Sequence, residues 1–478
     1  MPRSSQYMQG EKLYKIISVL DKKTTKKLIQ FASCSIKNSR PEVVACLSLI
    51  VKHYQSLLAE SLTEKELYAL VYSEAEKFNK AKCRDLLHFC QLVLNDFIVE
   101  ERLHANETLK QELLTEFYFQ NGLYKEYAQE LNRSLKQVEK SLTIDRKTEL
   151  EKFELKIKQY LVDDEDYLKN KKSLVEEALV HLDSYYFTEK LKWSHELMVS
   201  NLYSSQAYST PFLNKVLSEI NQEPYSKNVF ASIYYLITLF YKGNYSLEKY
   251  YKLKHSVIEI ISSVNAQEKR SLVIDLANYA RKLYMESNND ALIEEMHAIN
   301  LLGIEYRVFI KKQKFNSHNA MNIVNIALRL ELKAWAKEFC NSISTIIDNE
   351  NTLLIMNSMV EFNLGNYDEV RKILVNVEFV DIYFAIHAKS FLAKAYFMQG
   401  EYELLNNHLS AMDLFYRRNK LLSEELIESN LNFVLTLKKI VKHVTTPSKL
   451  TNIKNKVEGV SNMAYKAWVQ KILRERVA

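Results

Sequence analysis

Histidine and glutamate pairs are the first residues in this sequence whose spacing could support chemistry. Two Glu-x-x-His pairs occur, Glu101 with His104 and Glu294 with His297. Two such pairs, with two further glutamates, would supply the ligands of a di-iron site in a helical bundle. The chain has eleven histidines and many glutamates, however, so a pair of this kind is expected by chance. We therefore interpret these residues as ordinary surface or core side chains and predict no metal site.

The other catalytic motifs are incomplete. His195-Glu196 begins like the helix of a zinc protease, but position 199 is a valine, so the second histidine ligand is absent. Cys90 lies near His88 and could be a nucleophile, although a cysteine packed among apolar residues is the favoured interpretation. The sequence contains no phosphate-binding loop motif and no nucleophile-elbow motif. We expect no enzymatic activity, no cofactor and no small-molecule substrate.

The acidic run Asp163-Asp164-Glu165-Asp166 could attract a cation or a basic partner. A calcium-binding EF-hand loop needs alternating ligands and a glycine at its sharp turn, and this run has neither. An exposed loop is therefore the favoured interpretation.

The elements that must position all these residues are predicted to be helices. The chain has only 7 glycines and 5 prolines among 478 residues, far fewer than a fold rich in sheet and turns requires. Its hydrophobic content of 47% is enough to bury a sizeable core. Because the chain exceeds the size at which one compact core usually keeps growing, we expect either several domains or one elongated stack.

Glycine and tyrosine mark the expected turns between helices. Four glycines are followed two residues later by a tyrosine: Gly122 and Tyr124, Gly243 and Tyr245, Gly365 and Tyr367, Gly400 and Tyr402. Glycine permits the left-handed backbone conformation that ends many helices. Gly365 and Gly400 are 35 residues apart. One further unit can be placed upstream, with Lys333 in the glycine position and Trp335 in the tyrosine position, 32 residues before Gly365.

The segments Phe362 to Glu369 and Phe397 to Glu403 resemble the turn that joins the two helices of a tetratricopeptide hairpin. This resemblance implies stacked helical hairpins forming a right-handed α-solenoid. The sequence departs from the family pattern at Val370 and Leu405, where a small residue is usual, and the proline that ends each repeat is missing. The resemblance therefore concerns hairpin geometry and carries no peptide-binding groove.

A second resemblance covers more of the chain. The stretch from Tyr383 to Phe433, with Arg417-Arg418-Asn419-Lys420 inside it, looks like the C-terminal part of a bacterial family of long helical-repeat proteins. Residues 64–101 are more weakly similar to the N-terminal region of that family. The resemblance implies a helical-repeat fold and a cytoplasmic location, and it implies no function.

Several helices can be placed from periodicity and capping residues. Residues 423–441 carry apolar side chains on one helical stripe. Thr63 with Glu66 forms a predicted capping box, and Thr210-Pro211 and Thr446-Pro447 each offer a cap followed by proline in the first helical position. The apolar stretch from Val229 to Tyr241 is too short to span a membrane and is predicted to be a buried helix.

The cysteines favour a reducing compartment. Their odd number, five, and the absence of any C-x-x-C pair do not fit a disulfide framework. The first twenty residues contain no uninterrupted apolar run of signal-peptide type. We therefore expect a cytoplasmic protein without membrane association.

Four regions are expected along the chain. They are a helical N-terminal region (1–105), a central helical array (106–310), tetratricopeptide-like repeats (311–443) and a basic helical tail (444–478). Whether these are separate domains or one continuous solenoid is left open.

Positive charge is concentrated at the two ends. Residues 1–40 contain nine basic and two acidic side chains, and residues 438–478 contain ten and two, whereas the part between them has more acids than bases. A candidate basic surface consists of Arg417, Arg418, Lys420, Lys438, Lys439 and Lys442. Such residues could contact phosphate groups, although solvated helix faces are the favoured interpretation.

The leading hypothesis is a scaffold or adaptor that binds another protein on the surface of a helical solenoid, because stacked hairpins leave a long open face. The alternative is a nucleic-acid-binding protein that uses both basic ends.

Overall fold

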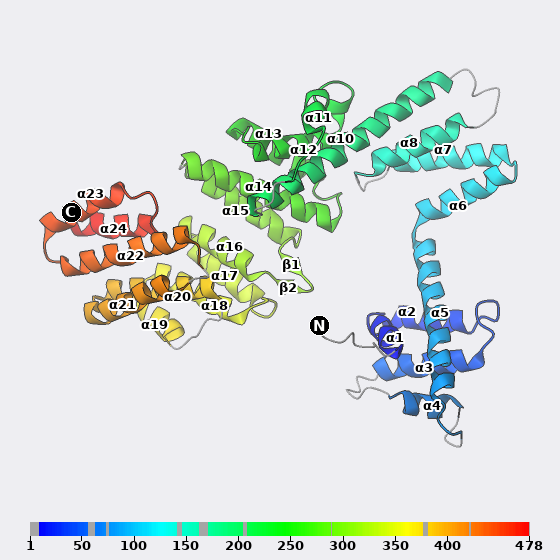
Figure 1. Cartoon of the computed structure of the whole chain (residues 1–478), viewed down its shortest axis with the longest axis horizontal. Helices are drawn as coiled ribbons and strands as arrows, with labels where there is room; N and C mark the ends of the chain where they lie inside the picture. The colour runs from blue at the N-terminus through cyan, green and yellow to red at the C-terminus, as the bar shows by residue number, and fades with distance from the viewer. Residues whose placement is uncertain are drawn as a thin grey trace. The chain divides into compact units, whose positions relative to one another are not determined.

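The computed structural model describes residues 9–55, 63–72, 76–140, 146–161, 171–203, 208–287, 289–375, 381–419 and 422–477. Apart from one short two-stranded hairpin, every regular element in these stretches is a helix (Figure 1). The predicted all-α class is therefore confirmed for the described residues. The chain divides into two compact units: unit 1 comprises residues 1–141 and 150–181, and unit 2 comprises residues 142–149 and 182–478.

Unit 1 is built around one long helix, α5. Its helices are α1 (Gln9–Ser18), α2 (Lys22–Ala32), α3 (Pro41–Gln55), α4 (Glu64–Tyr72), α5 (Lys80–Ala105), α6 (Glu107–Gln120), α7 (Tyr124–Lys140), α8 (Thr148–Tyr160) and the start of α10 (Lys171–Tyr203). Helices α1, α2 and α3 pack against α5, and α4 packs against α3. Their apolar faces form a core that includes Leu47, Leu94 and Phe97. Helices α6 and α7 pair as a hairpin.

Unit 2 contains the rest of α10 and a long series of helices. They are α11 (Leu213–Glu219), a 3₁₀ turn (Tyr225–Lys227), α12 (Val229–Tyr241), α13 (Leu247–Ile260), α14 (Ala266–Ser287), α15 (Ala291–Glu305), α16 (Ser317–Arg329), α17 (Lys333–Ile343), α18 (Glu350–Leu364), α19 (Tyr367–Leu374), α20 (Ile382–Gln399), α21 (Tyr402–Arg418), α22 (Glu424–Lys442), α23 (Pro447–Glu458) and α24 (Lys466–Val477). From α12 to α24, each helix packs against the next one along the chain. In addition, α16 contacts α18, and α18 contacts α20.

The apolar core of unit 2 is continuous across the limits expected at residues 310 and 443. One cluster extends from Leu191 to Ala395 in sequence, and a second extends from Ile386 to Leu473. Both limits therefore fall within packed regions, because helices before and after each limit bury side chains in the same cluster.

The four Gly-x-Tyr turns share one local structure. All four glycines adopt the left-handed conformation, with φ of 71° at Gly122, 82° at Gly243, 87° at Gly365 and 75° at Gly400. In each turn the residue after the glycine donates its N–H to a carbonyl five residues earlier, which satisfies an otherwise unpaired group at the helix end.

A phenylalanine completes each of these turns. The tyrosine ring contacts a phenylalanine five residues earlier, in the pairs Phe119 and Tyr124, Phe240 and Tyr245, Phe362 and Tyr367, Phe397 and Tyr402. The shared pattern is thus Phe-x-x-Gly-x-Tyr. The pattern predicted from the sequence contains only its second half, Gly-x-Tyr.

The upstream turn lies two residues earlier than predicted. Lys333 is the first residue of α17, and the left-handed residue is Glu331, with φ of 59°. Leu332 donates its N–H to the carbonyl of Ala327, as in the glycine turns. Glu331 therefore corresponds to Gly365, which follows it by 34 residues. Because this turn has no glycine, its position could not be recognised from the sequence. Trp335 does not take the tyrosine position of the turn; its ring stacks on Phe339, with ring centres 5.3 Å apart.

The predicted helix starts are confirmed in two places and wrong in a third. Thr63 and Glu66 bond reciprocally as a capping box, and Pro447 begins α23. Helix α11, however, begins at Leu213 rather than after Thr210, because Phe212 adopts a left-handed conformation that keeps Pro211 out of the helix.

The predicted buried helix from Val229 to Tyr241 is α12, with the same limits. Among the described residues, no helix combines the length and apolar character needed to cross a membrane. The predicted helix at residues 423–441 is α22.

A small β-hairpin precedes α16 and was not expected. Strands β1 (Ile310–Lys311) and β2 (Lys314–Phe315) pair antiparallel. Lys312 and Gln313 between them both have positive φ, as a type I′ turn requires. Strands of two residues are too short to produce an alternating sequence pattern.

Candidate functional site in unit 2

The two Glu-x-x-His pairs do not come together as a metal site. Glu101 and His104 lie on α5 in unit 1, whereas Glu294 and His297 lie on α15 in unit 2. The His297 ring packs edge-on against Trp335, and burial lowers its pKa. Within the described part of the chain, no group of three or more His, Cys, Asp or Glu side chains is placed to hold a metal ion.

Cys90 is a core residue. Its side chain is fully buried, and His88 is exposed on the same helix. The side-chain hydrogen bond with Cys46 and burial both raise the pKa of the Cys90 thiol. A protonated, inaccessible thiol is a poor nucleophile. The acidic run at residues 163–166 lies outside the described residues.

Only part of the candidate basic surface is free of ion pairs with the described residues. Asp413 pairs with both Arg417, at 2.7 Å, and Lys438, at 3.9 Å. Three of the predicted basic residues are exposed and form no ion pair with the described residues: Arg418, Lys439 and Lys442. Lys420 lies outside the part that the structure describes.

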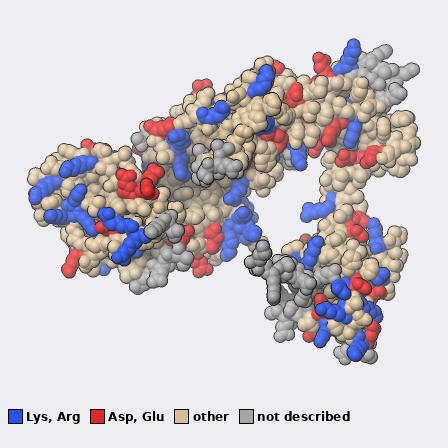
Figure 2. Space-filling model, in the orientation of Figure 1, with Lys and Arg blue, Asp and Glu red and all other residues tan. Residues whose placement is uncertain are grey.

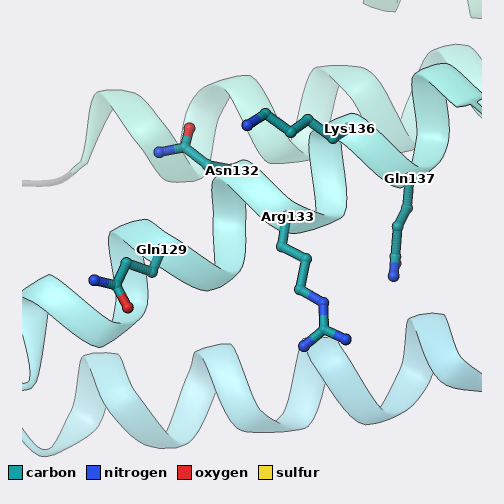
Figure 3. Close-up of a pocket in the computed structure, with 5 residues that line it drawn as sticks. All are labelled: Gln129, Asn132, Arg133, Lys136 and Gln137. Carbon is teal, nitrogen blue, oxygen red and sulfur yellow. The ribbon is translucent and has the colours of Figure 1, made fainter.

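A shallow hollow of about 570 Å³ follows α7 in unit 1. It is lined by Gln129, Asn132, Arg133, Lys136 and Gln137. Figure 3 shows these side chains spread along the helix rather than converging on one point. Asn132 accepts a hydrogen bond from Gln159, and Arg133 lies 3.7 Å from Glu130. The hollow therefore presents no convergent set of groups for a ligand.

A more structured groove of about 390 Å³ lies in unit 2 between α10 and α14, with α12 contributing one residue. Its lining residues are Lys192, Trp193, His195, Glu196, Val199, Tyr241, Gln267, Arg270, Ser271, Ile274, Asp275 and Asn278. On both α10 and α14 these positions recur at three- and four-residue intervals, which places them on one face of each helix. We take this groove as the candidate functional site.

A histidine and an aspartate are buried in the groove wall. His195 is 2% exposed and Asp275 is 4% exposed. His195 Nε2 lies 3.4 Å from Asp275 Oδ2, and the hydroxyl of Tyr241 donates to Asp275 Oδ1 at 3.0 Å. The His195 ring is stacked against Tyr241 and Tyr234, with centres 5.7 and 5.8 Å away. Both side chains are thus held in fixed positions.

Two polar atoms of this pair remain without a hydrogen-bond partner. These are His195 Nδ1 and Asp275 Oδ2, and neither makes a hydrogen bond to any described residue. Leaving a buried acceptor unpaired costs free energy, so it is uncommon in folded proteins. Asp275 Oδ2 lies 3.4 Å from His195 Nε2 but accepts no hydrogen bond, so a donor that reached it would be stabilised there.

A second charged cluster lies beside the groove, and its acidic and basic side chains pair with one another. Lys192 Nζ and Arg146 Nε each lie 3.0 Å from Glu268 Oε2. The hydroxyl of Tyr234 donates to the other oxygen of Glu268. Burial raises the pKa of the Glu268 carboxyl, but the Tyr234 hydrogen bond and the charges of Lys192 and Arg146 outweigh burial, so the net pKa is lowered. Glu268 therefore stays ionised and neutralises Lys192.

The described groove residues do not form an activated nucleophile. In the described residues, no serine, threonine or cysteine side chain forms a hydrogen bond with His195, as an activated nucleophile would. Burial and the nearby charge of Asp275 raise the pKa of Tyr241, which keeps its phenol protonated. The fixed groups are thus the carboxylate of Asp275, the imidazole of His195 beside it and the hydroxyl of Tyr241, which already donates to Asp275.

The sequence indicates one half of this site, because His195-Glu196 forms an incomplete zinc motif. Asp275, 80 residues later, belongs to no recognised motif. A signal was available, because Asp275 interrupts the apolar stripe formed by Leu272, Leu276 and Tyr279 on α14. An acid at such a core position indicates a specific polar contact. The chain matches no protein-family model, no curated protein and no solved structure.

Proposed function

We propose that this protein is a non-enzymatic scaffold or adaptor that binds another protein on the surface of a right-handed helical solenoid. The observation that carries the proposal is the packing of three successive hairpins, α16 with α17, α18 with α19 and α20 with α21. The first helix of one hairpin contacts the first helix of the next hairpin: α16 contacts α18, and α18 contacts α20. The second helix of the earlier hairpin contacts the same helix: α17 contacts α18, and α19 contacts α20. Repetition of one such step generates a solenoid with an extended open face.

The turn spacing supports the same proposal. Glu331, Gly365 and Gly400 occupy equivalent left-handed positions 34 and 35 residues apart, which fits the 34-residue period of tetratricopeptide hairpins. All five cysteines are unpaired, which fits the cytoplasmic location that we include in the proposal.

Cross-linking of the full-length protein in native cells tests this function. We expect reproducible recovery of a partner, with cross-links from Lys337 and Lys372, which are exposed on the second helices of two hairpins. Exposed Lys22 and Lys136 in unit 1 serve as internal controls. Recovery of no reproducible partner, or cross-links confined to the unit 1 lysines, would contradict binding on the hairpin surface.

A second candidate function is nucleic-acid binding by the C-terminal helices. Exposed lysines without an ion pair to the described residues recur along α22 and α23: Lys439, Lys442, Lys449 and Lys456. Figure 2 shows several Lys and Arg side chains over this end of the chain, where Figure 1 labels α21 to α24. At the N-terminal end, by contrast, Lys27 and Lys37 are paired with Glu101 and Glu100. The C-terminal face is thus the better phosphate-binding candidate.

Gel retardation at low and moderate salt tests this candidate. If it is correct, replacing Lys442, Lys449 and Lys456 together by glutamine weakens binding to DNA or RNA and reduces its salt dependence, because fewer counterions are released. The matched control replaces exposed Lys22, Lys23 and Lys136 by glutamine. Equal binding by the two triple variants would remove the C-terminal face as the binding surface.

A further inference from the structure

The groove between α10 and α14 contains carboxylate oxygens that accept no hydrogen bond from the described residues. Asp275 Oδ2 lies 3.4 Å from His195 Nε2 but accepts no hydrogen bond, although its side chain is almost completely buried. Glu196, at the same groove, forms no side-chain hydrogen bond or ion pair with the described residues. Both negative charges lie close enough to Tyr241 to raise the pKa of its phenol, after the larger effect of burial. Asp275 and Glu196 thus both line this groove.

The cations of the groove are already engaged. Lys192 Nζ lies 3.0 Å from Glu268 and also donates to the hydroxyl of Tyr234 at 3.0 Å. Arg270 donates to the main-chain carbonyl of Val308 at 3.0 Å. Glu268 neutralises Lys192, so the lining leaves two carboxylates, Asp275 and Glu196, against the guanidinium of Arg270, and this balance favours a cationic ligand over an anionic one.

We propose that this groove binds an organic cation, a primary ammonium or a guanidinium group, with Asp275 as the main acceptor and Glu196 as a second one. An N–H donor from the cation would pair with Asp275 Oδ2 in a charge-assisted hydrogen bond. The groove volume of about 390 Å³ lies in the range of small-ligand pockets.

The walls suit the carbon chain that carries such a cation. Trp193, which is 54% exposed, and Ile274, which is 39% exposed, line the groove together with Val199. The alkyl stem of a lysine, an arginine or a polyamine can cover this apolar surface while its charged end reaches the carboxylates. Tyr241 and Trp193 also present aromatic rings, which attract organic cations.

The cation has two chemical sources, a basic side chain of a protein or a free amine. The first would give the proposed adaptor a specificity pocket, whereas the second would make the groove a small-molecule site. The inference rests on the groove geometry alone and does not require the adaptor function.

Calorimetric titration of the full-length protein tests the proposal. The probes are Nα-acetyl-lysine methylamide, Nα-acetyl-arginine methylamide, putrescine and spermidine, with Nα-acetyl-norleucine methylamide as the neutral comparison. We expect at least one cationic probe to bind tenfold or more tightly than the norleucine compound. Preference for the amino-acid amides assigns the site to a basic side chain, and preference for the polyamines assigns it to a free amine; both results support the groove.

Variants locate the binding to the named carboxylates. Asp275→Asn keeps an acceptor for Tyr241 and is expected to weaken cation binding at least tenfold, and Glu196→Gln to weaken it severalfold. Glu294→Gln changes an exposed glutamate on α15 and should leave binding unchanged. If Asp275→Asn does not fold, cation binding is compared between Glu196→Gln and Glu294→Gln. Weaker binding by Glu196→Gln alone supports the proposal, and equal binding contradicts it.

The proposal is overturned if no cationic probe binds more tightly than the norleucine compound, or if the carboxylate variants bind as the wild type does. These outcomes leave the cross-linking test of the adaptor function unaffected, because that test depends on α17 and α19.

Discussion

Lys394 is the most unusual single residue outside the groove. It lies on α20, is 5% exposed, and is surrounded by aromatic rings. The distances from its Nζ to the ring centres are 4.0 Å for Phe391, 4.3 Å for Phe362, 4.9 Å for Tyr465 and 5.4 Å for Trp468. Burial lowers the pKa of Lys394 from 10.5 to about 7. The ring faces favour the charged form and offset part of the cost of burying it.

This depressed pKa predicts a pH-dependent stability. Between pH 7 and 10.5 the unfolded chain holds a proton on Lys394 that the folded chain releases, so the free energy of unfolding rises with pH. The rise is at most about 1.4 kcal/mol per pH unit. Lys394→Met keeps the length of the side chain and removes the titrating group. We expect urea unfolding, followed by circular dichroism between pH 7 and 9.5, to show a smaller rise for the variant.

Lys372→Met is the matched control for this prediction. Lys372 is exposed on α19 and pairs only with Glu369, three residues earlier, so its replacement should preserve the wild-type pH dependence. Equal slopes for wild type and Lys394→Met would show that the amine stays charged in the folded protein and that the rings stabilise its ammonium form.

At the scale of elements, the glycine turns define where hairpins form. Gly365 ends α18 with φ of 87°, and no atom lies within 4 Å of the position that a Cβ would take. Gly459 ends α23 with φ of −78°, and a Cβ there would meet the carbonyl of Lys456 at an ordinary 3.7 Å. The two glycines thus occupy similar helix ends and differ in backbone conformation.

Gly365→Ala is expected to lower the free energy of unfolding of unit 2 by about 1–2 kcal/mol, because an L-residue is strained in the left-handed region. Gly459→Ala should be neutral or stabilising by up to about 1 kcal/mol, because alanine restricts the unfolded chain without strain. Chemical unfolding of both variants measures the contrast. Equal effects at the two positions would mean that backbone conformation does not determine the cost.

Local sequence signals predicted these elements to different degrees. The apolar run of α12 and the capping box at Thr63 were predicted correctly, because both depend on neighbouring residues. The start of α11 was wrong, and the turn before α17 was placed two residues late. In these two places Phe212 and Glu331 hold left-handed conformations that glycine usually supplies. Nothing in the local residue types indicates such conformations.

At the scale of the whole molecule, each unit has its own apolar core. Leu94 is fully buried in the core of unit 1, and Leu437 is fully buried in unit 2. A unit with a separate core can unfold as a separate cooperative transition. We therefore expect two transitions in scanning calorimetry of the full chain.

Paired core variants test this independence. Leu94→Ala should lower the midpoint of one transition and Leu437→Ala that of the other, since each removes about 2–5 kcal/mol from one core. If each variant lowers a single shared transition, the two units unfold as one cooperative body.

The sequence by itself determined that the described chain is helical, where some of its helices lie and where the glycine turns fall. These properties depend on residues close together in the chain, through apolar periodicity and the backbone freedom of glycine. Only the tertiary structure decided that Asp275 meets His195 in a groove and that four rings surround Lys394. Those contacts join helices separated by many residues, and they depend on packing that no local pattern encodes.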